Sequence, residues 1–187
     1  MVDFASLQIE TERLLLKPPA ADEFDAFCEM MADEQAARYI GEQMSRSQAW
    51  RAWCTMVGAW HVRGFGMFSV FLKDGGDWVG RIGPWQPEEW PGTEIGWAVM
   101  PAYAGKGYAL EASVASMDFA FDVLGWDDVM HCIDPDNVPS IALAQRLGST
   151  NRGPTRMPEP FQDHPVDNWG QSRQQWQANR KQFQKGA

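Results

Sequence analysis

The sequence has few cysteines, few basic residues and no long apolar run, and each shortage excludes a class of protein. Only Cys28, Cys54 and Cys132 occur in 187 residues, and they are widely separated. An odd number at this spacing fits neither a disulfide framework nor a zinc site, which predicts a reducing, cytoplasmic setting and no metal. Because no apolar stretch approaches the length of a membrane-spanning helix, we expect no membrane partner.

The charge balance also narrows the choice of partners. Acidic residues outnumber basic ones by 25 to 16, which gives a formal net charge of −9. A negative surface argues against direct binding to nucleic acid and favours a cationic substrate over an anionic one. The length predicts one domain over residues 1–187, with a core large enough to fold without metal or disulfide.

The run at 93–124 has the clearest pattern: a short strand, a loop with glycines and a long amphipathic helix. Its strand alternates between a large apolar face and a face of small residues with one carboxylate, which is the period of a half-buried strand. The first face holds Ile95, Trp97 and Val99, and the second holds Glu94, Gly96 and Ala98. Helical spacing then continues to Leu124, with Gly125 as the stop.

The loop at 104–109 asks for a chemical explanation. Gly105 and Gly107 stand just before the helix, where residues without a Cβ allow several backbone N–H groups to point at one place. Those donors and the positive end of the helix dipole favour a phosphate-like anion. An ordinary strand-to-helix connection is the alternative, and neither nucleotide fingerprint fits, since Leu110 interrupts G-x-G-x-x-G and no G-x-x-x-x-G-K-[ST] occurs.

The remaining periodicity and turn residues place the other elements around this run. In chain order they are a strand at 9–17, helices at 23–32 and 47–64, a hairpin of strands at 64–72 and 78–85, a strand at 129–133, a helix at 137–148, a possible strand at 152–157, a last strand at 166–171 and a solvated terminal helix at about 172–184. A helical crossover makes strand 129–133 parallel to strand 93–99. The predicted class is α/β (α+β), with a mixed, mostly antiparallel central sheet of six to seven strands flanked by helices.

Four sequence motifs taken together resemble those of the GNAT superfamily of N-acetyltransferases, and most closely those of its Rim-type branch of ribosomal-protein N-terminal acetyltransferases. They are T-E-R-L-L-L at 11–16, A-V-M-P at 98–101, A-G-K-G-Y-A-L-E-A at 104–112 and N-V-P-S-I-A-L-A-Q-R-L-G at 137–148. The resemblance runs in order from about Leu7 to Leu147. It implies a GNAT fold splayed between its fourth and fifth strands, and acetyl-CoA as cosubstrate for direct transfer to a primary amine. The acceptor would be a protein N-terminus or a small molecule, and homodimers through the last strands are common in the family.

The resemblance also implies which residues bind the cosubstrate. Backbone N–H groups of the loop would hold its pyrophosphate, the end of the fourth strand would border its pantetheine arm, and the second motif would complete the site. The implied set is Trp97, Val99, Met100, Ala104, Gly105, Lys106, Gly107, Tyr108, Ala109, Asn137 and Ser140.

The chain departs from the family pattern at two positions. Ala104 stands where relatives have Arg or Gln, so one side-chain contact to the cosubstrate is lost while the backbone donors remain. Ala144 stands where many relatives have a tyrosine that protonates the departing thiolate. These departures motivate an alternative reading, a catalytically silent GNAT-fold module that binds CoA or regulates another protein.

The catalytic candidates follow from the chemistry of an amine acceptor, which attacks only when deprotonated. By resemblance Glu94 takes that proton, directly or through water, with His131 and Glu111 as competitors. An unpaired N–H of Trp97 or Val99 would stabilise the oxyanion.

Ser140 is the candidate that protonates the thiolate, with Tyr108, a water or unassisted release of the thiolate as alternatives. Aromatic residues would wall the acceptor pocket, and the candidates are Tyr39, Phe65, Trp85, Trp90, Trp97 and Phe161.

Overall fold

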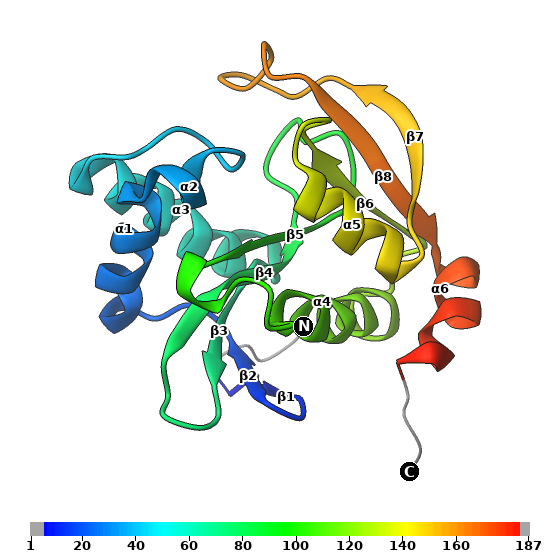
Figure 1. Cartoon of the computed structure of the whole chain (residues 1–187), viewed down its shortest axis with the longest axis horizontal. Coiled ribbons are helices and arrows are strands. Elements are labelled where there is room, and N and C mark those ends of the chain that lie inside the picture. Colours follow the sequence, from blue (N-terminus) through cyan, green and yellow to red (C-terminus); the bar gives the residue numbers. More distant parts are fainter. Residues whose placement is uncertain (1–5, 184–187) are drawn as a thin grey trace.

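The computed structural model describes residues 6–183, and within them one sheet carries helices on both faces (Figure 1). Its strands are β1 (Ile9–Glu10), β2 (Leu14–Lys17), β3 (Phe68–Leu72), β4 (Trp78–Trp85), β5 (Glu94–Val99), β6 (Asp128–Ile133), β7 (Thr150–Thr155) and β8 (Val166–Ser172). Its helices are α1 (Phe24–Ala32), α2 (Glu34–Ala37), α3 (Arg46–Arg63), α4 (Tyr108–Asp118), α5 (Val138–Leu147) and α6 (Arg173–Asn179).

The eight strands lie in the order β1-β2-β3-β4-β5-β6-β8-β7. All neighbours are antiparallel except β5 and β6, which the α4 crossover makes parallel, as predicted. These two strands pair at one point only, where Glu94 lies opposite Met130, and beyond it they diverge (Figure 1). The predicted splay is therefore present, and it widens toward the end of β5 from which the glycine loop leaves.

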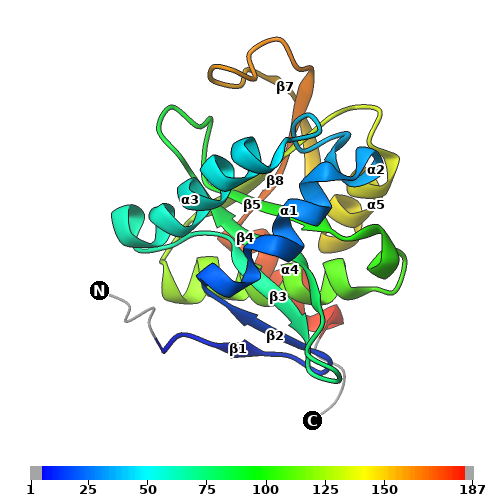
Figure 2. The same cartoon turned by 90° about the vertical axis from the view of Figure 1, so that its left-hand side faces the viewer.

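Helices α1 to α3 cover one face of the sheet, while α4 and α5 cover the other (Figures 1 and 2). The first layer buries Phe27, Met31 and Trp53 against Met67 and Ala98. Leu16, Phe68 and Ile82 pack on the α4 side against Ala112 and Phe119. The alternation of β5 thus has the predicted sense, since Ile95 faces α4 while Glu94 faces the layer of α1 to α3.

One strand prediction was wrong, and the difference has a physical cause. The single strand expected at 9–17 is a hairpin of β1 and β2, because the Thr11 hydroxyl donates to the Leu14 carbonyl at 3.3 Å and turns the chain. The possible strand at 152–157 is present as β7 at residues 150–155, two residues earlier than predicted, and it pairs with β8 around a register shift. The sheet therefore has eight strands rather than six or seven.

The terminal helix is shorter and better packed than predicted. It begins after Ser172, whose hydroxyl accepts from the N–H of Gln175 in the expected capping box, and ends in a 3-10 turn at Arg180–Gln182. Its Trp176 is fully buried, with ring centroids 6.5 Å from Phe121 and 5.8 Å from Phe183. The helix thus packs against the α4 layer instead of being solvated, and residue 184 lies outside the described part.

No helix within residues 6–183 has both the length and the apolarity needed to span a membrane.

Candidate active site

The opening between β5 and β6 exposes backbone donors of β5. Hydrogen-bonded and non-bonded pairs alternate along antiparallel strands. Met100 donates to the Val79 carbonyl at 2.9 Å and Ala98 lies opposite Arg81, so the even-numbered residues of β5 bond to β4. The N–H groups of Trp97 and Val99 therefore point the other way, into the splay, as the oxyanion hypothesis requires.

The loop at 104–109 leads from the end of β5 into α4 with the predicted backbone geometry. Gly105 and Gly107 have φ angles of 74° and 83°, in the left-handed region that favours glycine. Within the described residues, the N–H groups of Gly105, Lys106 and Gly107 have no backbone acceptor, and the first N–H groups of α4 have none by helix geometry. Such a set of free donors at a helix N-terminus is suited to a phosphate-like anion.

Arg13, which sequence reasoning did not single out, braces this loop from the turn between β1 and β2. Its Nη1 donates to the Lys106 carbonyl at 3.0 Å, and its Nε donates to Glu111 at 2.7 Å. Its guanidinium also lies 4.6 Å from the centre of the Tyr108 ring. Burial tends to raise the pKa of Glu111, but hydrogen bonds from Thr11 and Arg13 outweigh it and lower that pKa. A carboxylate so occupied is a structural anchor, so Glu111 is excluded as the competing base.

The second motif meets the first across the splay. Asn137 caps α5, with its Oδ1 accepting from the Ser140 N–H at 3.2 Å. The Ser140 hydroxyl oxygen in turn accepts from Trp97 Nε1 at 3.1 Å, so the β5 indole fixes the serine at the opening. Ala144, one turn further along α5, is buried against Ile133 and Trp169, and it supplies no hydroxyl.

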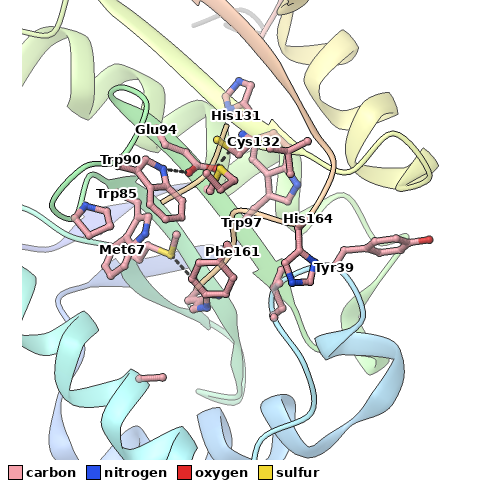
Figure 3. A pocket seen from close by; sticks show the side chains of 18 of the residues that line it. Tyr39, Met67, Trp85, Trp90, Glu94, Trp97, His131, Cys132, Phe161 and His164 are labelled. Carbon is pink, nitrogen blue, oxygen red and sulfur yellow. Dashed lines mark hydrogen bonds between the residues drawn. The ribbon is translucent and has the colours of Figure 1, made fainter. Parts of the chain in front are cut away.

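A cavity of about 470 Å³ lies beside these elements, on the α1 to α3 side of the sheet. Its volume falls in the range typical of small-molecule sites. Figure 3 shows Trp85 and Met67 on one side and His164 and Tyr39 on the other, with Glu94 and Phe161 between them. The same cavity reaches Trp97, Asn137 and Ser140, so it joins the splay to the aromatic chamber.

Of the six aromatic residues predicted to wall this chamber, five line it: Tyr39, Trp85, Trp90, Trp97 and Phe161. Phe65 does not, because its ring packs edge-on against Trp126 at 5.2 Å. The loop at 104–109 is not among the residues that line the cavity either. The predicted site residues thus form two adjoining parts, an anion loop at the end of β5 and a chamber at its start.

Glu94 is a buried carboxylate of the chamber, with only 7% of its surface exposed. Its Oε2 accepts from Trp90 Nε1 at 2.5 Å, and its Oε1 accepts from the Cys132 N–H at 3.1 Å (Figure 3). Burial raises the pKa of Glu94 to about 7, against these two hydrogen bonds and the charge of Arg81. A carboxyl group that titrates near neutral pH inside a cavity is suited to accept a proton from an amine.

His131, the other competing base, is committed to structural hydrogen bonds. The Ile95 carbonyl can only accept, so His131 Nδ1, 2.7 Å away, carries the proton. His131 Nε2 then accepts from the Ser149 hydroxyl at 3.0 Å, while Gln171 donates to that same oxygen at 3.1 Å. Burial lowers the pKa of His131 to about 4, so the ring stays neutral and its lone pair is occupied. Glu94 is therefore the base that the geometry favours.

Sequence reasoning missed one charged group of the chamber, Arg81. Strand 78–85 reads W-V-G-R-I-G-P-W, and a single arginine in an otherwise uncharged strand was the available signal. Its side chain lines the cavity, and its Nη1 donates to Met67 Sδ at 2.7 Å.

A splayed parallel pair, with a loop of free backbone N–H donors at its wide end and a buried carboxyl group at its narrow end, is an arrangement suited to group transfer from a phosphate-bearing cosubstrate. Residues 13–150 match the family model described as "Acetyltransferase (GNAT) domain". Since the match covers most of the chain, the protein belongs to the GNAT acetyltransferase family and is an acyltransferase.

Individual relatives agree with this assignment. The chain is 26% identical over 147 residues to the "Uncharacterized N-acetyltransferase YnaD" of Bacillus subtilis (strain 168), covering 79% of this chain and 85% of the relative. It is 28% identical over 161 residues to the "Uncharacterized N-acetyltransferase p20" of Bacillus licheniformis, covering 84% and 90%. The crystal structure of an acetyltransferase from Agrobacterium tumefaciens str. C58 superposes with a TM-score of 0.81 at 28% identity, covering 92% of this chain and 98% of that one.

Proposed function

We propose that the protein transfers an acetyl group from acetyl-CoA to the primary amine of a small molecule held in the chamber beside Glu94. The observation that carries the proposal is the position of Glu94, buried in a chamber walled by Trp85, Trp90 and Phe161 and continuous with the splay. An open trough would suit a protein N-terminus, whereas an aromatic-walled cavity of about 470 Å³ suits a small amine.

The residues present fit acetyl-CoA, which supplies the thioester that activates the acetyl group. The loop at 105–109 would hold its pyrophosphate through backbone N–H groups, and a Cβ at Gly107 would lie 3.3 Å from Arg13 Nη2, so the cradle is closely fitted. Val99 and Met100 would border the pantetheine arm where β5 leaves the splay. Ala104 is exposed and its replacement of Arg or Gln leaves these backbone donors in place.

A residue of the chain can then be assigned to each chemical step. Glu94 takes a proton from the ammonium group, so that the nitrogen lone pair is free to form the new C–N bond. The N–H of Trp97 or Val99 donates to the carbonyl oxygen as negative charge develops there. Ser140 would give a proton to the sulfur as the C–S bond breaks and take in its place the second proton of the attacking nitrogen, which that nitrogen loses on becoming an amide. The Ser140 oxygen already accepts from Trp97, so its own hydrogen is free to point elsewhere.

Four more specific expectations from the sequence form part of this proposal. They are a Rim-type ancestry, one domain over residues 1–187, a cytoplasmic location and a homodimer through the last strands. The sequence motifs at 104–112 and 137–148 support the Rim-type ancestry, and the lack of a disulfide pattern supports the cytoplasmic location. Gel filtration of the full chain tests the dimer.

The proposal is tested directly by measuring thiol release from acetyl-CoA, first with a panel of small primary amines and then with a panel of N-terminal peptides. We expect release with small amines and little with peptides. The silent-module alternative predicts that acetyl-CoA binds, by isothermal titration calorimetry, without release for any amine. Release with peptides alone would contradict the small-molecule acceptor.

Ser140→Ala is expected to lower kcat about 10-fold, the loss of roughly one hydrogen bond in the transition state. The dissociation constant of acetyl-CoA should stay within about threefold, because the backbone donors of the loop do not change. Stopped-flow and steady-state thiol release separate the two quantities. Ser140→Thr, which keeps the hydroxyl, is the control, and equal losses in both variants would contradict proton donation by this residue.

A further inference from the structure

Arg81 has a partly buried guanidinium with almost no protein partner. Its Nη1 meets only the thioether of Met67, a weak acceptor, and its Nε is buried without a hydrogen bond to any described residue. No carboxylate of residues 6–183 lies within 4.0 Å of its nitrogens. Burial lowers the pKa of Arg81 to about 10, so the group is still charged at neutral pH. A charged group shielded from water without hydrogen-bond partners costs free energy unless a ligand supplies those partners.

Arg81 and Glu94 occupy the same face of the sheet on either side of Gly96. A Cβ at position 96 would lie 2.6 Å from Met67 Cε and 3.7 Å from Glu94 Oε1. Met67 Sδ in turn touches Arg81 Nη1 at 2.7 Å (Figure 3). The thioether thus separates the guanidinium from the carboxylate, and the chamber presents two unlike charges that are near each other without being paired.

We infer that the acceptor is a zwitterion, an apolar α-amino acid or a close analogue, whose carboxylate binds Arg81 while its amine faces Glu94. This rests on the proposed acetyl transfer and names the substrate class for it. A planar guanidinium matches a carboxylate with two parallel hydrogen bonds, and Arg81 has the free donors to make them. The walls of Trp85, Trp90 and Phe161 then suit an apolar side chain.

The charge pattern gives the orientation. Glu94 attracts the ammonium end and Arg81 the carboxylate end, so a zwitterion pairs with both of these groups at once. A plain cationic amine would leave Arg81 without a partner. The acidic composition, with a net charge of −9, therefore says less about the acceptor than these two interior groups do.

The test compares matched ligands on the wild-type enzyme: Val, Leu, Met, Phe and Trp, each with its amide and its decarboxylated amine, and ethanolamine phosphate as a phosphate-bearing amine. We expect at least one amino acid to exceed its amide and its decarboxylated amine in kcat/KM by about 10- to 100-fold, the effect of a charged hydrogen bond. Arg81→Gln should reduce that preference to below about threefold. Arg38→Gln, which removes an exposed arginine of the same cavity lining, should leave it unchanged.

The outcomes separate this inference from the proposed function. Equal or faster acetylation of the amides or of the phosphate-bearing amine would overturn the carboxylate site while acetyl transfer stands. If Arg81 only balances Glu94, Arg81→Gln would shift the pH profile and keep the preference, which also overturns it. Absence of thiol release with every amine would refute the transfer. The carboxylate site would still be supported if free N-acetyl amino acids bind, as followed by tryptophan fluorescence, and if Arg81→Gln abolishes that binding.

Discussion

Glu94→Gln is expected to lower kcat/KM by about 10²- to 10⁴-fold at pH 8, the range for loss of a general base. The amide cannot take the proton of an ammonium group, so only the small deprotonated fraction of the acceptor can react. The side chain keeps its volume and one oxygen for the donors Trp90 Nε1 and Cys132 N–H. Steady-state thiol release with a reactive amine measures the loss.

The pH profile of the wild-type enzyme provides a second measurement of the same group. Because burial raises the pKa of Glu94 to about 7, kcat/KM should rise with pH through about 7, and Glu94→Gln should lack this limb. The contribution of Glu94 to the free energy of unfolding changes with pH in the opposite direction to the activity. The folded pKa lies above the unfolded value of 4.5, so the folded state binds more protons between these values, and the contribution of Glu94 to stability is lost as pH rises from 4.5 through 7.

Glu88→Gln is the matched control, since Glu88 also lines the cavity but is exposed and paired with Arg63 at 2.9 Å. It should retain most of the activity. Acetyl-CoA affinity and the melting temperature of Glu94→Gln must also be measured, because one donor near position 94 loses its acceptor. If activity falls less than threefold, or only in proportion to cosubstrate binding, Glu94 is not the base.

The parts of the site that are local in the sequence could be predicted from it. The alternation of β5 and the two glycines before α4 are short-range patterns, and each corresponds to the observed element within a residue or two. Pairing of the loop with the Asn137 motif was available only as a resemblance. In the structure the hydrogen bond from Trp97 to Ser140 ties the Asn137 motif to β5, the strand that leads into the loop.

The parts that depend on register and packing could not be predicted. Nothing local shows that β5 and β6 share one pair only, because that divergence depends on residues 36 apart in the sequence lying side by side. The role of His131 depends on Ser149 and Gln171, which lie on other elements. Arg13 and Arg81 were overlooked because an isolated arginine has no periodic signal, and its partners become visible only when the chain is folded.

Gly107→Asp is expected to raise the dissociation constant of acetyl-CoA at least about 100-fold, which corresponds to about 2.7 kcal/mol. The new carboxylate would stand among the N–H groups that face the pyrophosphate. Two unit charges about 4 Å apart repel by roughly 4 kcal/mol at an effective dielectric constant near 20, before screening by salt. It would also lie beside Arg13, whose Nη2 is 3.3 Å from a Cβ at this position, and so draw that cation away from Lys106 and Glu111.

The control is Gly125→Asp, which isolates the backbone effect from the electrostatic one. Gly125 has a φ of 75°, close to the 83° of Gly107, and a Cβ there would meet nothing within 4 Å. Both variants therefore carry the same added charge and a similar left-handed strain of about 1–2 kcal/mol, and they should lose similar thermal stability. Calorimetric titration of acetyl-CoA should separate them, because Gly125 follows the π-helical turn at Phe119–Val123, far along the chain from the loop. Equal affinities in the two variants would place the pyrophosphate elsewhere and remove the anion loop from the mechanism.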